Sequence, residues 1–253
     1  MAYTKLIPHV TRGAKIEEIS EAKPGDAYRL CIPAEKADNY RLAQLDDYTK
    51  TARGRFPLRP PIHLNLSAQV SSNSIPGTWG FGLWNDPFGL SLGFGGNPFR
   101  FPVLPNAVWF FGASKENYLS FSEDKPAQGF LAQSFRSSRF HPLLIPAGLA
   151  LPFSRQRTRR LLGRVIAEDG ILLNLDVTQW HRYSLHWHED RVALEVDHAQ
   201  VFESTVSPNP PLGLVIWIDN QFAAFTPEGR IGFGVLENPA PAWLEIKNIE
   251  INM

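Results

Sequence analysis

The stretch 180–204 constrains the fold of this chain most, because its apolar side chains recur at every second position. A polar turn at 188–190 interrupts the alternation, which then resumes and ends at a second turn at 197–198. Period-two alternation broken by short polar turns is typical of half-buried antiparallel strands. The alternating apolar residues are Tyr183, Leu185 and Trp187 before the first turn, and Val192, Leu194 and Val196 after it.

The same stretch resembles a known family. The run Trp180-His-Arg-Tyr183, followed by the Val196-Asp197 turn, resembles the late strands of the family 16 glycoside hydrolases and of other concanavalin A-like sandwiches. The resemblance extends over residues 60–251. It implies an all-β fold, a concanavalin A-like β-sandwich or jelly roll.

Composition is consistent with that fold. The chain of 253 residues holds 21 prolines and 19 glycines, and helical periodicity is scarce. We expect a single sandwich domain over 1–253, with 1–27 as an approach segment. Strands are expected near 27–32, 62–71, 78–84, 106–112, 118–121, 130–135, 171–175, 183–187, 191–196, 212–218, 230–235 and 243–251.

Net charge and cysteine content limit which classes of partner and which cellular compartment are expected. Net charge is zero, which argues against a nucleic-acid partner. Cys31 is the single cysteine, so no intrachain disulfide forms and a reducing compartment is mildly favoured. The first residues lack the apolar core of a signal peptide, and no apolar run is long enough to span a membrane. We therefore expect a soluble, cytoplasmic protein.

Two regions depart from the strand pattern. Residues 85–105 form a Gly/Pro-rich loop that is more apolar than an ordinary solvated loop. Residues 141–168 begin apolar and become helical near 153–166, with Ser154 as the expected N-cap. One interpretation is a helix packed across a sheet edge with its arginines solvated; the other is a lid, or a membrane contact through 141–166. The apolar stripe of this helix is Leu161, Leu162, Val165 and Ile166.

The catalytic acids that the family resemblance implies are missing from their expected strand. Sandwich glucanases of this kind carry Glu-x-Asp-x-x-Glu or Glu-x-Asp-x-Glu on one strand, and a retaining pair of carboxylates lies about 5 Å apart. The strand 77–84 resembles the one that precedes this motif, but the next strand, 106–112, contains no acid. We therefore expect no hydrolysis of β-glucans by the usual retaining route.

Two strands each place a Trp and an Asp on the same face, opposite residues expected in the core. In the first, Trp84 and Asp86 follow Gly80 and Gly82, whose missing side chains predict a shallow floor that a ligand can approach. In the second, Trp217 precedes Asp219. Indole faces stack on sugar rings or other flat ligands, and a nearby carboxylate accepts hydrogen bonds. The alternative is that each Trp lies in the core and each Asp ends a strand. The predicted ligand-binding residues are Trp84, Asn85, Asp86, Trp109, Trp217, Asp219 and Asn220, with Asp86 and Asp219 as the candidate catalytic pair.

No metal site and no cofactor is expected. His186 and His188 share a strand face with no acidic or cysteine partner at ligand spacing along the chain, and His181 lies nearby. Three function classes remain open. The first is a glycan-binding or divergent glycosidase-like domain, and the second is an enzyme or binding protein for an apolar small molecule in a closed pocket on the concave face. The third is a structural or interaction module.

Overall fold

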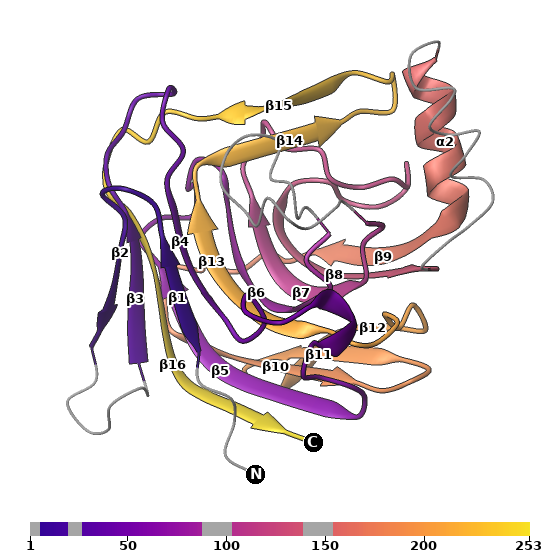
Figure 1. Cartoon of the computed structure of the whole chain (residues 1–253), viewed down its shortest axis with the longest axis horizontal. Coiled ribbons are helices and arrows are strands. Elements are labelled where there is room, and N and C mark those ends of the chain that lie inside the picture. Colours follow the sequence, from indigo (N-terminus) through magenta and orange to yellow (C-terminus); the bar gives the residue numbers. More distant parts are fainter. Residues whose placement is uncertain (1–5, 20–26, 88–102, 139–153) are drawn as a thin grey trace.

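The computed structural model describes residues 6–19, 27–87, 103–138 and 154–253. The described strands form two antiparallel seven-stranded sheets and a separate two-stranded hairpin, so the predicted all-β sandwich is confirmed (Figure 1). In spatial order, the first sheet contains β1 (Ile7–Val10), β4 (Leu42–Asp46), β13 (Gly213–Asp219), β6 (Thr78–Trp84), β7 (Ala107–Ala113), β8 (Gly129–Ser137) and β9 (Ile166–Leu172). The second contains β12 (Ala199–Ser204), β11 (Val192–Val196), β10 (His181–Trp187), β5 (Ile62–Val70), β16 (Ala242–Asn252), β3 (Ala27–Ile32) and β2 (Lys15–Glu18).

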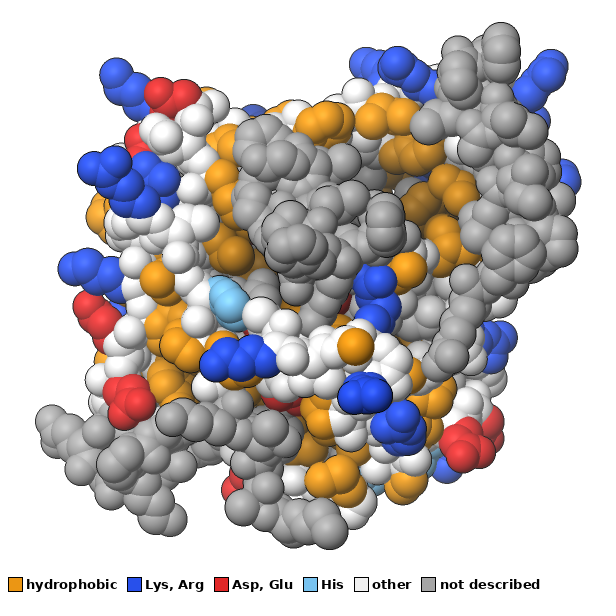
Figure 2. Space-filling model, viewed as in Figure 1, with side chains coloured by type: hydrophobic (Ala, Val, Ile, Leu, Met, Phe, Trp, Pro, Cys, Tyr) orange, Lys and Arg blue, Asp and Glu red, His pale blue; other side chains and the backbone are white. Residues whose placement is uncertain are grey.

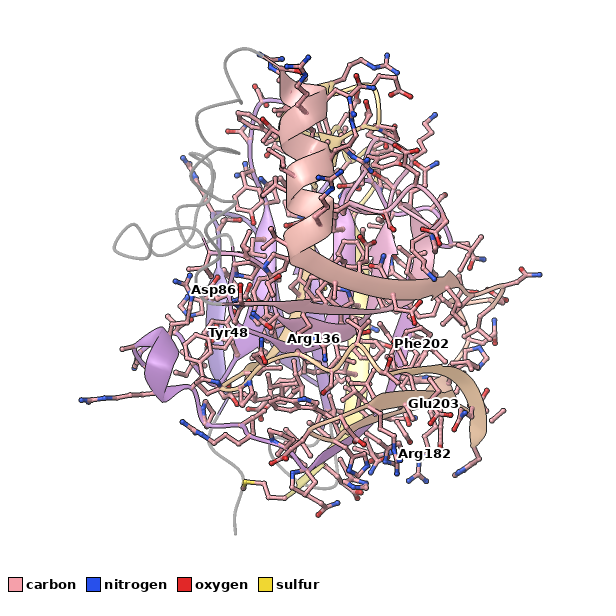
Figure 3. The ribbon with its side chains drawn as sticks, turned by 90° about the vertical axis from the view of Figure 1, so that its right-hand side faces the viewer. Tyr48, Asp86, Arg136, Arg182, Phe202 and Glu203 are labelled. Carbon is pink, nitrogen blue, oxygen red and sulfur yellow. The ribbon has the colours of Figure 1, made fainter. Side chains whose placement is uncertain are left out.

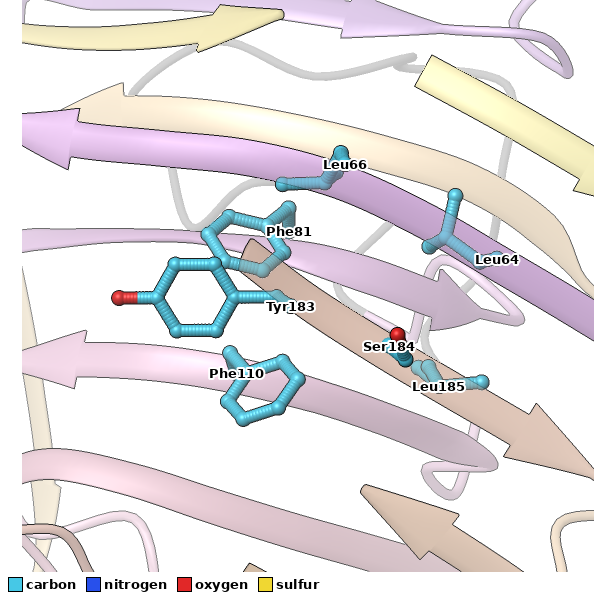
Figure 4. A pocket seen from close by; sticks show the side chains of 7 residues that line it. All are labelled: Leu64, Leu66, Phe81, Phe110, Tyr183, Ser184 and Leu185. Atoms are coloured by element: carbon cyan, nitrogen blue, oxygen red, sulfur yellow. The ribbon is translucent and has the colours of Figure 1, made fainter. Parts of the chain in front are cut away.

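The main hydrophobic core lies between the two sheets and follows the predicted alternation. Trp79, Phe81 and Leu83 of β6 face this core, and Tyr183 and Leu185 of β10 meet them from the other sheet. Figure 4 shows where the two layers meet around a small void that is too small for a water molecule. Tight packing of this kind is the norm for protein interiors.

The opposite face of the first sheet is called here the concave face. Figure 1 shows that this sheet is curved, with α2 (Arg155–Val165) and the hairpin of β14 (Gln221–Phe225) and β15 (Ile231–Val235) on the inner side of the curve. A second, separate apolar cluster covers the concave face. The sandwich therefore has two apolar layers, one between the sheets and one on the concave face of the first sheet.

Several predicted boundaries need correction. The approach segment 1–27 contains two strands, β1 at the edge of the first sheet and β2 at the edge of the second. The sequence did not predict them, because short strands with mixed exposure carry little periodic signal. The predicted strand 118–121 is an isolated bridge between Tyr118 and Ala224. The predicted strand 171–175 begins at Ile166, directly after the helix. Within the described residues, no helix is both long and apolar enough to cross a membrane.

The predicted helix is confirmed, and its N-cap is the expected residue. Ser154 has extended backbone angles, and its side chain accepts a hydrogen bond from Arg157 N. Ile166 is buried in the concave cluster, and Leu161, Leu162 and Val165 are half-buried. Of these three, Leu162 packs against the concave cluster. The apolar stripe is thus used to attach α2 to the edge of the concave face. The first part of the predicted insertion, 141–153, and the loop residues 88–102 lie outside the described residues.

Candidate functional site

Three indoles lie on the concave face and contact one another. The rings of Trp84 and Trp217 stack with centroids 5.9 Å apart and 6° between their planes. The Trp109 ring lies 6.1 Å from Trp84 and 5.9 Å from Trp217, tilted against both. Trp109 and Trp217 are each 6% exposed, and Trp84 is half-buried. Neither Trp84 nor Trp217 lies between the sheets, but Trp217 is buried in the cluster on the concave face, so the core alternative holds for the burial of Trp217 and not for a position between the sheets.

Strand pairing explains why the indoles meet. Trp217 of β13 is paired with Gly80 of β6, and Trp84 is paired with Gly213. A Cβ added at Gly80 would come within 2.9 Å of the Trp217 ring, so the glycine leaves the space that this ring occupies. The sequence predicted that the space above Gly80 and Gly82 is open to a ligand. At Gly80 this space is instead occupied by the indole of Trp217.

The indole N–H groups are hydrogen-bonded within the chain. Trp84 Nε1 donates to Tyr48 Oη at 2.7 Å, and Trp217 Nε1 donates to Thr78 Oγ1 at 3.0 Å. Trp109 Nε1 is 3.4 Å from Gln133 Oε1. These bonds fix the ring orientations, so what the site offers a ligand is ring surface.

Asp219 is buried at one end of the β13–β6 pair. Its Oδ1 accepts hydrogen bonds from the Thr78 hydroxyl at 2.8 Å and from Gln221 N at 3.2 Å, and its Oδ2 accepts from Tyr40 Oη at 3.3 Å. Burial raises the pKa of this carboxyl to about 7, although the hydrogen bonds act in the opposite direction. Asn220, also buried, bonds to the backbone of Asn39, Arg41 and Leu236.

Asp86 and Asn85 lie at the other end of β6. Asn85 braces the backbone, with its side chain bonded to Leu104 O and Asn106 N. Asp86 is half-buried, with a positive φ of 50° that places it in a turn. Figure 3 shows Asp86 near Tyr48 at this end, beside η1 (Arg53–Arg55). The Arg53 guanidinium donates to the backbone oxygens of Asn85 and Asp86.

The register separates the two candidate carboxylates. Asp219 is paired with Thr78 at the start of β6, whereas Asp86 lies beyond Trp84 at its end. The six steps of extended strand from Thr78 to Trp84 span roughly 20 Å. Retaining and inverting glycosidases need carboxyl groups about 5 Å or about 6.5–9.5 Å apart. The prediction that Asp86 and Asp219 form a catalytic pair is therefore wrong. Buried Asp219 and Asn220 serve as internal braces.

Sequence reasoning missed one concave-face carboxylate, Glu168. This residue of β9 is paired with Phe135 of β8 and shares its face. Glu168 Oε2 accepts hydrogen bonds from Phe121 N at 2.7 Å and Ser122 N at 3.2 Å, and among the described residues no hydrogen-bond donor meets the buried Oε1. Burial raises the pKa of this carboxyl. The sequence held no signal for it, because β9 was expected to start later.

Asp46 is another carboxylate on the concave face, and its oxygens are hydrogen-bonded to neighbouring residues of the chain. It is fully buried and accepts hydrogen bonds from Tyr48 N, Thr49 N and the Thr49 hydroxyl. On β7 the concave positions are the apolar residues Ala107, Trp109, Phe111 and Ala113. The described concave face therefore offers aromatic surface with few available carboxylates.

The histidines have partners across strands that the sequence did not reveal. His186 Nδ1 lies 2.8 Å from His63 Nδ1, and His186 Nε2 lies 3.6 Å from Glu195 Oε1. His181 bonds to Asp197 in the turn after β11. Among the described residues, no group of three or more His, Cys, Asp or Glu side chains is arranged to hold a metal ion.

One arginine of α2 is buried, which corrects the interpretation of a fully solvated arginine face. Arg159 is 2% exposed. Its Nε donates to Phe225 O at 2.9 Å and its Nη2 donates to Ser120 O at 3.0 Å. The guanidinium also lies 5.5 Å from the centre of the Tyr118 ring. Arg159 therefore ties α2 to β14 and to the segment between β7 and β8.

Comparison with known proteins gives similarity only at the level of structure. The sequence matches no family model and no curated protein. Similar solved structures include LamAcat from Zobellia galactanivorans, with 14% identity over 91% of this chain and 81% of that chain and a TM-score of 0.48. A putative beta-glucanase from Mycobacterium abscessus has 12% identity over 98% and 92% and a TM-score of 0.49. A family 16 endo-glucanase from Bacteroides ovatus has 10% identity over 98% and 94% and a TM-score of 0.48. Similarity at this level carries no argument about function, and the proposed function depends on the residues of this chain.

Proposed function

We propose that this chain is a carbohydrate-binding protein whose concave face binds a glycan without hydrolysing it. The observation that carries the proposal is the position of Trp84. It is the most exposed of the three concave indoles, and Asp86 and Arg53 lie at the same end of β6. A half-buried indole at the same strand end as a carboxylate and a guanidinium is a combination suited to a ring that carries hydroxyl groups.

The chemistry of such a site is simple. The apolar C–H face of a sugar ring packs on an aromatic face, and the neighbouring polar groups hold its hydroxyls. Trp84 is supported from behind by its stacking on Trp217 and is oriented by its hydrogen bond to Tyr48. A pre-oriented ring loses little conformational entropy when the ligand binds.

The arrangement of acids supports binding without hydrolysis. Glycosidases of both stereochemical classes use two carboxyl groups that flank the scissile bond. Asp46 and Asp219 are buried and hydrogen-bonded within the chain, and neither is paired across strands with Glu168. We therefore propose that a bound glycan leaves the site unchanged.

Titration of the protein with laminarin and lichenan, together with a reducing-sugar assay on the same samples, tests this proposal. The expected result is saturable binding of at least one glucan, with no reducing sugar released above the protein-free blank. Release of reducing sugar that depends on Asp86 or Glu168 would overturn the non-hydrolytic part. If the protein bound neither laminarin nor lichenan, the proposal that it binds a glycan would be contradicted.

A second candidate, an apolar small-molecule ligand, is favoured by one observation. The concave cluster is formed by aromatic and aliphatic side chains, and the indole N–H groups of Trp84, Trp109 and Trp217 are all directed at partners within the chain. Such a surface suits a flat apolar molecule as well as a sugar face. Titration with a fluorescent apolar probe, competed with laminarin, distinguishes the two ligand classes.

A further inference from the structure

Helix α2 carries an unusual concentration of positive charge. Its sequence, Arg155 to Val165, contains five arginines and no acidic residue. Apart from buried Arg159, all of these arginines are exposed. Arg157, Arg160 and Arg164 follow one another at spacings of three and four residues, which places them along one face of the helix. This face lies opposite the side that carries Leu162 and packs on the concave cluster.

This charge pattern disfavours the helix itself. Two arginines in the first turn, Arg155 and Arg157, lie at the positive end of the helix dipole, where acidic side chains are preferred. Like charges three and four residues apart also repel one another. Sequence choices that oppose local stability are expected where a segment serves a function. A fixed row of arginines suits a partner that carries several negative charges.

Apolar side chains are exposed on a neighbouring element. Ile231 and Phe233 of β15 are 39% and 48% exposed. The turn of the same hairpin touches the start of α2, since a Cβ added at Gly229 would lie 2.7 Å from Gln156 N. Figure 2 shows hydrophobic side chains along this edge, with Lys or Arg side chains at the α2 end. Exposed acids also lie nearby: Glu228 is 3.7 Å from Arg230, and Glu123 is 3.9 Å from the buried Arg159 of α2.

We propose that this edge, formed by the arginine face of α2 and by β15, docks on an anionic lipid surface. Arginines bind lipid phosphates, and exposed Ile and Phe side chains enter the boundary between headgroups and acyl chains. A nucleic acid would satisfy the arginines but would give no role to Ile231 and Phe233. The arginine face lies opposite the Leu162 side of α2, which packs on the concave cluster, so the proposal does not depend on glycan binding.

Vesicle co-sedimentation of the full chain tests the proposal. The probes are phosphatidylcholine vesicles with and without about one third phosphatidylglycerol. Binding is expected to the anionic vesicles, not to the neutral ones, and to weaken as salt is raised. The triple variant R157Q/R160Q/R164Q is expected to lose about a hundredfold in partition coefficient. The double variant I231S/F233S is expected to bind more weakly while keeping its dependence on anionic lipid.

The matched control removes three exposed arginines elsewhere, R12Q/R182Q/R191Q, and is expected to bind like the wild type. The α2 triple variant should melt no lower than the wild type, because it relieves like-charge repulsion. Equal losses in the α2 and control variants would show that only the total charge matters and would overturn the proposal. Binding to RNA or heparin but not to anionic vesicles would also overturn it, in favour of another polyanion. Absence of vesicle binding by the wild type would overturn it directly.

Discussion

The indoles of Trp84 and Trp217 stack almost parallel on the concave face, with ring centroids 5.9 Å apart and 6° between their planes. The stack depends on glycine at position 80, because Gly80 is paired with Trp217 and lies beneath its ring. The stack is therefore built into the backbone of two adjacent strands. Any change that lifts Trp217 from β6 should disturb Trp84 as well.

Replacing Gly80 with alanine should destabilise the protein. The new Cβ would meet Phe110 O at 2.4 Å and the Trp217 ring at 2.9 Å, so the ring or the backbone must move. Overpacking of this kind costs about 1–3 kcal/mol. Thermal unfolding of Gly80→Ala, followed by tryptophan fluorescence, measures the loss. Gly54→Ala is the matched control, since nothing lies within 4 Å of its added Cβ. Equal melting temperatures for the two variants would contradict the described packing.

The stability of the protein should depend on pH through Asp219. Burial raises its pKa from 3.8 to about 7, so between these pH values the folded state holds a proton that the unfolded state releases. This contribution to stability is fully present below about pH 4, is lost as the pH rises to about 7, and stays constant above that. Asp219→Asn cannot ionise. The stability of the wild type relative to Asp219→Asn should therefore fall from pH 4 to pH 7, by up to about 4 kcal/mol. Urea unfolding across this range measures the difference, and a constant difference would refute the assignment.

Arg159 should contribute far more to stability than its neighbour Arg160. Arg159 is buried and donates to two backbone carbonyls that belong to separate segments, whereas Arg160 is exposed. Arg159→Met leaves both carbonyls without this donor and should cost about 2–4 kcal/mol. Arg160→Met should change stability by less than about 0.5 kcal/mol. Chemical unfolding of both variants checks this, and similar losses would show that Arg159 is not the tie between α2 and β14.

The fold was predictable where alternation is regular. In β6 the large residues Trp79 and Phe81 face the core and Trp84 faces the other side, as the period of two requires. In β13 the same reasoning places Trp217 and Asp219 together. Alternation fixes the face of a residue within its own strand, so these assignments needed no knowledge of the partner strand.

The relation between strands was not predictable in the same way. Whether Asp219 is level with Thr78 or with Asp86 depends on the pairing of β13 with β6, and no local sequence signal sets a register between segments so far apart. The burial of Arg159 and Glu168 was not predictable either. Both side chains are hydrogen-bonded to the backbone of the segment between β7 and β8, and no sequence pattern indicates where that segment lies. The candidate site was thus predicted as a set of residues on one face, and its geometry came from the structure.

The affinity of Trp84→Ala for laminarin and lichenan, measured by isothermal titration beside the wild type, tests the glycan-binding proposal most directly. Trp180→Ala is the matched control, because Trp180 is 37% exposed and contacts Lys247 of β16, in the other sheet. Thermal melts first establish that both variants are folded. The proposal predicts that Trp84→Ala weakens binding by about 1–3 kcal/mol, the loss expected for a stacked indole, while Trp180→Ala binds like the wild type. Equal affinities of folded Trp84→Ala and the wild type, or binding of neither glucan by the wild type, would contradict it.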